Sequence, residues 1–441
     1  MMAERCLLIS AVAVSLLSLA PTGAHADDAT TPTTAAPSAP ATAQVQQKQK
    51  TVQEVRDESD SSTASDSYQP KGIDLGQFLL LPKTEVEGTF NDNVFAKNYD
   101  AKADFITTVR PQLDLRSRFE RHEITATASY ERVSYQHYDH DSVNNYLLQT
   151  TGRYDITDSS NMNLQIYTQS GHEDRSSPDD ANGIRPTPFN TLYGGGDLLL
   201  GTGRFKTNLD GTIVRRTFGD TYSSGGPLFN HLRDRMEYEE KLRESYEIFP
   251  GYFAVTEGAL NQRIYDNAQD TSGIKRDSHG WRANGGLGVD ISQVVRGDVL
   301  VGYFQQNYSS STLPTAEGTS VKALLNWTPT RMTVVIPSIE RSVEETSQAP
   351  ASGIVQTTGS VFVRHELQRN IILSGSLGYT NQDYQGGSRT DNLYQGMFSV
   401  TYLFNPNLYM AGVLNRQQRD SDTTANGYIQ NSAMLRVGVQ Y

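Results

Sequence analysis

From residue 77 to the last residue, apolar and polar side chains alternate along the chain with a period of two. Within 77–91, for example, Val86 and Phe90 share one face, and Glu85 and Glu87 share the other. This alternation is typical of β-strands, because successive strand side chains point to opposite faces, whereas helices repeat every three to four residues. The sequence therefore predicts an all-β fold.

Short and long breaks in the pattern follow one another along the chain. Short breaks include 157–161 and 249–251, and long breaks include 171–187 and 266–277. This rhythm indicates an up-and-down meander of about eighteen antiparallel strands, an even number and of the length that transmembrane β-barrels use. With a strand spacing of ~4.8 Å and a tilt of ~40°, the ring would be roughly 35 Å across and would enclose water. We therefore expect a transmembrane up-and-down antiparallel β-barrel over residues 77–441.

Other fold classes fit less well. A soluble β-sandwich would show no alternation of short and long turns, and a propeller would repeat a signature about every 40 residues, which is not found. The only apolar stretch near helical length lies at the N-terminus, which excludes a bundle of membrane helices. The 38 Lys and Arg against 50 Asp and Glu give a net charge of −12. Nucleic acid is therefore not an expected partner, because phosphate binding needs a basic face.

The N-terminal segment is expected to be exported and then cleaved. Residues 1–26 have the pattern of a signal peptide, with Arg5 before an apolar core and Ala24-His25-Ala26 as a cleavage site. The one cysteine, Cys6, lies inside this signal, so the mature chain would hold no disulfide or thiolate ligand. Residues 27–76, rich in Ala, Thr, Pro and Gln, are predicted to be a disordered periplasmic tail. A linker is the simpler interpretation, and a docking peptide for another envelope protein is the alternative.

Charged residues on the strand face opposite the apolar residues would point into the lumen. Both signs occur there, so facing acidic and basic rows would screen solutes by charge and size. The alternative is that these groups only pair with one another and keep the lumen wet. Aromatic residues such as Tyr303 and Tyr394 are interpreted as interfacial girdles rather than sugar-stacking platforms. The candidate pore-lining residues are Lys83, Glu85, Glu87, Arg110, Asp114, Arg116, Glu131, Lys206, Asp210, Arg216, Asp298, Lys322, Arg341 and Arg436.

The C-terminal strand ends on an aromatic residue. Val437, Val439 and Tyr441 share one face of a strand that must pair with 77–91 to close the ring. Until closure this strand is an exposed edge, which the barrel-assembly machinery could capture by strand addition. We therefore predict that these three residues form an assembly signal. The alternative is that Tyr441 is one more girdle residue.

Catalytic and metal chemistry have little support. The segment Tyr135–Asp141 carries His137 and His140 beside two aspartates, a set that could bind a divalent metal or bridge lipopolysaccharide phosphates through Ca²⁺ or Mg²⁺. A polar loop tip is the simpler interpretation. No nucleophile-elbow or metalloprotease pattern occurs. We expect no enzyme activity, no metal site and no cofactor.

Several phrases resemble a known family. They are GIDLGQFLLLP at 72–82, NDNVF at 91–95, RGDVLVGY at 296–303, NWTPT at 326–330 and RSVEET at 341–346. The chain resembles, from residue 72 to its end, the outer-membrane barrels of Gram-negative bacteria that form the second putative β-barrel porin family. The resemblance implies an outer-membrane location, with lipid and lipopolysaccharide as surroundings, and no catalytic residues. Some members look associated with exopolysaccharide gene clusters.

The expected function is a porin-like channel that passes small polar solutes through a charged lumen. Export or surface retention of an exopolysaccharide is the main alternative, and an adhesin or surface scaffold with a closed lumen is a third. Short turns face the periplasm in such barrels, and an even number of strands returns the chain to its starting side. We therefore expect the N-terminal tail and the C-terminus to be periplasmic.

Overall fold

A computed structural model describes residues 68–441, except 181–182, 271, 292–293 and 349. The predicted signal peptide at 1–26 and most of the tail predicted at 27–76 lie outside the described residues. Among the residues described, no helix has the length and apolar character needed to cross a membrane.

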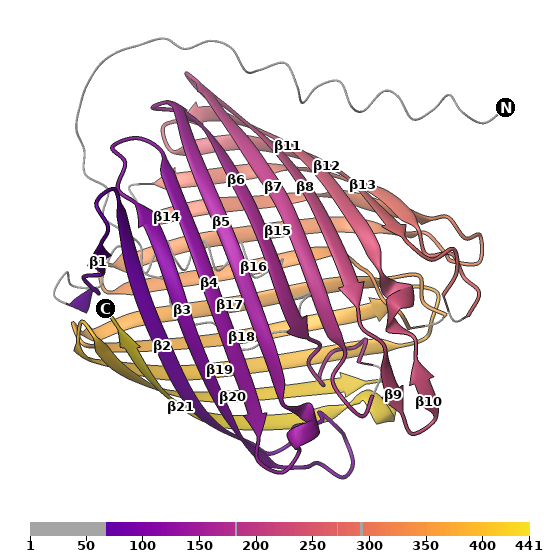
Figure 1. Cartoon of the computed structure of the whole chain (residues 1–441). Helices are drawn as coiled ribbons and strands as arrows, with labels where there is room; N and C mark the ends of the chain where they lie inside the picture. Colours follow the sequence, from indigo (N-terminus) through magenta and orange to yellow (C-terminus); the bar gives the residue numbers. More distant parts are fainter. Residues whose placement is uncertain (1–67, 181–182, 271, 292–293, 349) are drawn as a thin grey trace. The chain divides into compact units, whose positions relative to one another are not determined.

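The described chain forms a closed antiparallel barrel (Figure 1). Its sheet has 19 strands, of which β1 pairs only with β2, so 18 strands make the ring, as the alternation predicts. Ring strands are 12 to 16 residues long. Each pairs with its neighbours in the sequence, and β8 pairs with β11. The ring strands are β2 Phe78–Asn91, β3 Asp104–Ser117, β4 Glu123–Tyr135, β5 Val143–Thr157, β6 Ser160–His172, β7 Pro188–Thr202, β8 Phe205–Phe218, β11 Arg235–Phe249, β12 Tyr252–Tyr265, β13 Ser278–Ile291, β14 Val295–Tyr308, β15 Ala316–Thr330, β16 Thr333–Glu344, β17 Ile354–Gln368, β18 Ile371–Tyr384, β19 Thr390–Asn405, β20 Leu408–Ser421 and β21 Tyr428–Gln440.

The first and last ring strands close the barrel. β2 and β21 pair from Lys83↔Gln440 to Asn91↔Ser432, and the amide of Tyr441 donates to the carbonyl of Pro82 at 3.1 Å. Before Pro82, β21 no longer covers β2, and β1 (Ile73–Asp74) pairs with β2 instead. Part of the segment predicted as tail is therefore regular strand. It satisfies backbone groups of β2 that the C-terminus leaves unpaired.

Strand side chains alternate between the lumen and the outer wall. On β2, Glu85 and Glu87 are 0% and 2% exposed, whereas Val86 and Phe90 are 48% and 52% exposed. The exposed apolar residues form the outer wall, as expected for a surface in contact with lipid. Closure of the ring leaves no unpaired strand edge in the hydrocarbon. Tyr394, predicted as a girdle residue, lies on this wall beside Tyr379, with the two ring centroids 5.3 Å apart.

Short turns and long loops occupy opposite rims. Turns such as 203–204 and 406–407 lie at the rim that also holds β1 and the C-terminus (Figure 1). The longest loops, 173–187 and 219–234, lie at the other rim. The second of these contains the hairpin of β9 (Thr221–Ser223) and β10 (Gly226–Leu228), and the 3₁₀ turn η3 (Asn230–Arg233). Further 3₁₀ turns are η2 (Asp139–Asp141) and η4 (Thr424–Asn426).

Candidate functional site

One cluster of charges lies inside the barrel where the ring closes, on β2, β3, β4 and β21. Arg110 Nη1 lies 3.0 Å from Glu85 Oε2 and 3.0 Å from Glu87 Oε1. Arg110 Nε donates to Glu131 at 2.9 Å, and Arg436 Nε donates to Glu87 at 2.7 Å. Because Glu85 and Glu87 are buried, these guanidinium groups replace bulk water as their partners. Five of the predicted residues thus form one network.

The edges of this network complete its charge balance. Lys83 Nζ lies 3.5 Å from Glu85 Oε1, and the Tyr409 hydroxyl donates to the same carboxylate. On the other side, Asn145 donates to Glu131 at 2.8 Å. The three carboxylates of the network therefore face three cations, and its charges nearly cancel.

A second cluster surrounds Glu257 on the other side of the ring. Glu257 is 3% exposed, and Lys322 Nζ lies 3.0 Å from its Oε2. Arg243 and Arg282 each place a guanidinium nitrogen 3.9 Å from Glu257. Arg243 also contacts Asp298 at 2.7 Å. Here too, carboxylates and cations alternate along the lumen wall.

A third cluster lies toward the rim with the long loops. Arg216 Nε and Arg235 Nε donate to Glu237 Oε1 at 3.1 Å and 2.8 Å. Arg263 Nη1 donates to Glu345 Oε1 at 2.5 Å. Arg216 is thereby placed in a paired network, as are most of the predicted pore-lining residues.

Loop 173–187 crosses the mouth of the barrel. Asp179, which is 3% exposed, accepts hydrogen bonds from the Thr346 hydroxyl at 2.8 Å and the Ser347 amide at 3.0 Å. Arg419 on β20 donates to the carbonyl of Ser176 at 2.5 Å. One loop connects β6 to β7, and the other connects β16 to β17. Around the ring, eight strands separate these two loops in one direction and ten in the other. The two loops therefore start from nearly opposite sides and meet over the lumen.

Neighbouring loops hold this bridge in place. Arg175 donates to both carboxylate oxygens of Asp141, at 2.9 Å and 2.7 Å. Arg233 donates to Glu173 at 2.9 Å. The start of the bridging loop is therefore bound both to the loop between β4 and β5 and to the loop between β8 and β11. Burial alone would lower the pKa of Arg233, but the attraction of Glu173 and its hydrogen bonds raise that pKa above its usual value. These pairs tie residues 173–175 at the start of the loop to the two neighbouring loops.

Three other predicted residues lie on the lumen face outside the clusters. Asp114 accepts a hydrogen bond from Thr127 at 2.6 Å. Lys206 Nζ lies 5.2 Å from the ring centre of Phe253. Arg116 shares the strand face of Asp114. These residues surround the lumen without forming a shared centre.

Arg341 lies near the loop rim of β16. Its strand register pairs Arg341 with Val321, on the face that carries the exposed Ile339, whereas Glu340 lies opposite Lys322 on the lumen side. The Arg341 side chain is nevertheless partly buried, because its Nε is shielded from solvent and its Nη2 lies 3.8 Å from the position of an added Cβ at Gly318, beside the buried Phe304. Its role as a pore-lining residue stays a prediction.

Strand β11 carries charged residues that face the lumen but are absent from the candidates predicted from the sequence. Lys241 Nζ lies 3.0 Å from Asp210, and Arg243 contacts the second cluster. The signal was present, because basic and acidic residues recur at every second position of β11. It was hidden by Glu240 and Glu244, which lie on the outward face between them.

The histidine-rich loop is held by ordinary ion pairs and hydrogen bonds. His137 Nδ1 lies 2.8 Å from Asp104 Oδ1, and His140 Nε2 lies 3.5 Å from Asp141. Asp141 is also the partner of Arg175. Within the described part of the chain, no group of three or more His, Cys, Asp and Glu residues is arranged to hold a metal.

The predicted assembly residues lie on the outer wall at the closing strand. Val437, Val439 and Tyr441 are 38%, 56% and 55% exposed. They are placed at the end of the strand that completes the ring. Their role in assembly stays a prediction.

Solved structures similar to this chain include outer-membrane proteins. The copper transporter OprC is 9% identical, with a TM-score of 0.44, over 84% of this chain and 82% of that chain. Pseudomonas aeruginosa OccK2 (OpdF), in complex with glucuronate, is 10% identical, with a TM-score of 0.44, over 82% and 98%. The ferric citrate transporter FecA is 11% identical, with a TM-score of 0.41, over 85% and 79%. No curated protein sequence matches the chain.

A family match covers nearly all of the described residues. Residues 66–441 match the family described as "Putative beta-barrel porin 2". This range includes the complete ring of 18 strands and the charged lumen. The resemblance seen in the sequence is therefore confirmed, and the chain belongs to this family of porin-like outer-membrane β-barrels.

Proposed function

We propose that the protein is a channel through which small polar solutes cross the outer membrane, with both of its termini in the periplasm. The observation that carries this proposal is the lumen wall, where ionised side chains of both signs form one network around Arg110 and another around Glu257, on the other side of the ring. Such a wall attracts water and polar solutes. Its charges are mostly paired, so it favours neither anions nor cations strongly.

The loop bridge sets the size limit in this proposal. Asp179 joins loop 173–187 to the opposite side of the mouth, so a solute from outside must pass beside the bridge. Small sugars and ions would pass, and large polymers would be held back. The length of the bridging loop, rather than the width of the ring, then limits passage.

Planar-bilayer conductance of the refolded protein tests this proposal. We expect single-channel currents with weak ion selectivity, reduced progressively by sugars of increasing size. Asp179→Ala should raise the conductance and admit larger sugars, because it removes the acceptor that joins the two loops. Asp139→Ala is the matched control, since Asp139 lies on another loop with its side chain 93% exposed. Absence of current from both the unmodified protein and Asp179→Ala would overturn the proposal.

We further propose that the barrel-assembly machinery recognises the C-terminal strand through Val437, Val439 and Tyr441. Support comes from the place of this strand, which closes the ring with β2 and is therefore the last edge to be satisfied.

A further inference from the structure

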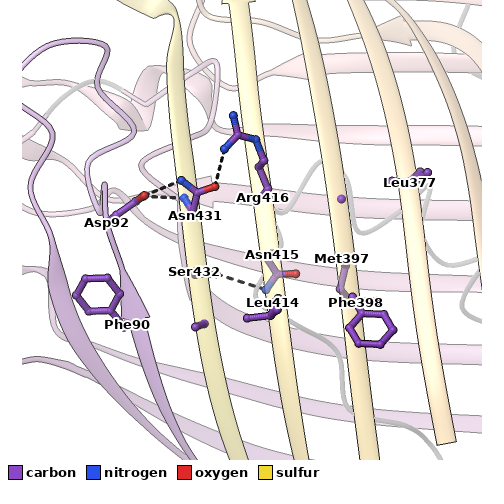
Figure 2. A pocket seen from close by; sticks show the side chains of 12 residues that line it. Phe90, Asp92, Leu377, Met397, Phe398, Leu414, Asn415, Arg416, Asn431 and Ser432 are labelled. Carbon is purple, nitrogen blue, oxygen red and sulfur yellow. Dashed lines mark hydrogen bonds between the residues drawn. The ribbon is translucent and has the colours of Figure 1, made fainter.

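An apolar groove of about 530 Å³ lies on the outer wall between β18 and β2. Leu377, Phe398, Leu414 and Phe90 line it, each at least half exposed (Figure 2). Gly396 also lines the groove. A Cβ at Gly396 would meet only Leu377 Cδ2, at 3.6 Å, so the glycine leaves open space between its neighbours. The volume far exceeds that of one water molecule, about 30 Å³ in the liquid. The groove can therefore hold a segment of a hydrocarbon chain.

One end of the groove is cationic. Arg416 Nη1 donates to Asn431 Oδ1 at 2.9 Å, and Asn431 in turn donates to Asp92 through Nδ2 at 2.7 Å (Figure 2). Among the residues that the structure describes, no carboxylate lies within 4.0 Å of Arg416. The Asn431 amide orients the guanidinium without neutralising it. Arg416 thus presents a positive charge at a polar edge of the groove, where Asn431 separates it from the carboxylate of Asp92.

The polar end lies at the level of an aromatic girdle on the loop side. Gln418, two residues from Arg416 along β20, is paired with Tyr394 of β19. Tyr394 packs against Tyr379, whose hydroxyl donates to Asn392 at 2.8 Å. Tyrosines in such belts mark the depth of lipid headgroups. Arg416 is paired with Gly396, which is paired with Leu377, so these residues form the upper row of the groove near headgroup depth. The pair Phe398↔Leu414 forms the next row, deeper in the hydrocarbon.

We propose that this groove is a binding site for one lipopolysaccharide molecule of the outer leaflet. A phosphate of its lipid A would bind Arg416 through charge-assisted hydrogen bonds, and an acyl chain would lie over Gly396 between Phe398 and Leu414. The proposal rests on the orientation in the proposed function, which places the long loops outside. Charge complementarity favours this lipid, because it combines an anionic head with chains that extend into the hydrocarbon.

Native mass spectrometry of the delipidated full chain with added lipid A tests the site. Arg416→Gln should weaken retention of diphosphorylated lipid A about tenfold, the effect of one strong charge-assisted contact. The same variant should be insensitive to removal of the lipid phosphates, whereas the unmodified protein should lose affinity by the same factor. Gly396→Leu should also weaken binding, because it fills part of the groove.

Gly152→Leu is the matched control for Gly396→Leu. Gly152 lies on β5 with no atom within 4 Å of an added Cβ, away from the groove, so its substitution should leave lipid binding unchanged. Equal retention of phosphorylated lipid A by Arg416→Gln and the unmodified protein would overturn the proposal. Loss of a dimer in Gly396→Leu with unchanged lipid binding would also overturn it and assign the face to a second copy. Conductance of these variants should match the unmodified protein, so a failure of the channel proposal would leave the lipid result intact.

Discussion

Removal of Arg110 should destabilise the barrel more than any other single change of a lumen charge at the seam. Arg110 donates to three carboxylates, and Arg110→Met would leave each of them with fewer partners. Glu87 keeps Arg436 at 2.7 Å, but Glu131 keeps only Asn145 at 2.8 Å among the contacts described. Breaking a fully buried ion pair costs about 3–5 kcal/mol. Since Glu131 is 18% exposed and can regain some water, we expect a loss of about 2–3 kcal/mol.

The free energy of unfolding can be measured from urea titrations of the folded protein in lipid vesicles. The two tryptophans of the chain, Trp281 and Trp327, are 39% and 45% exposed on the outer wall and report on removal from lipid. The double variant Arg110→Met with Glu131→Gln should recover about 1 kcal/mol, since neighbouring charges are not additive. Asp114→Asn is the control and should cost less than about 1 kcal/mol, because Asp114 accepts hydrogen bonds from the neutral Thr127 and Gln112 side chains. An unchanged unfolding midpoint for Arg110→Met would show that water solvates these carboxylates and refute the reasoning.

Three further perturbations have defined outcomes. Leu435→Arg places a charge on the lipid face at a cost of about 2–4 kcal/mol. It should therefore reduce the amount of heat-modifiable folded protein on gels more than Arg436→Leu, which leaves Glu87 bound to Arg110. Equal behaviour of the two variants would contradict the register. Deletion of Val439–Tyr441 should slow assembly in cells, seen as periplasmic proteolysis in a pulse-chase experiment, more than it lowers stability in detergent; normal accumulation would exclude an assembly signal. Burial would raise the pKa of Asp270, but hydrogen bonds from the Ile274 amide and Arg276 hold this pKa below its usual value. The ionised Asp270 therefore stabilises the loop fully above about pH 4, and this stabilisation is lost as the pH falls further. Pepsin should therefore cut loops 266–277 and 345–353, which Arg276 joins, faster at pH 2 than at pH 4, and an equal rate would show that Asp270 does not hold them.

The all-β fold and the strand count were predictable because the barrel imposes one rule on every strand. Alternate residues must suit lipid on one side and water on the other, so the period of two is visible in each segment. Glu85, Glu87 and Arg436 are buried, whereas the adjacent Val86 and Leu435 are exposed. At Arg341 the rule is harder to apply, because the adjacent Glu340 is paired with the lumen residue Lys322.

The partners of these residues were not predictable, because alternation gives a face but not a neighbour. Arg110 stands directly opposite Glu131 because β3 and β4 keep one register on both sides of this pair, from Val109↔Arg132 to Gln112↔Ser129, and the sequence pattern does not give that register. The contact that bridges the two loops was even less predictable, because Asp179 and Thr346 are 167 positions apart and no periodic pattern links them. The outer groove depends on Gly396 and Arg416 standing directly opposite each other, which is a matter of strand register.

The densest charge network lies at the seam, where ring closure must be most specific. Glu87 and Arg436 are directly paired across β2 and β21, and Tyr409 reaches Glu85 from β20. None of these contacts exists before closure, because their partners lie at opposite ends of the chain. A slip of one residue would turn Glu85 and Glu87 toward lipid and Val86 into the lumen. Burying several carboxylates there gains little stability by itself, but each wrong register would leave ionised groups in hydrocarbon. The charges that keep the lumen wet therefore also make the closing register the only favourable one.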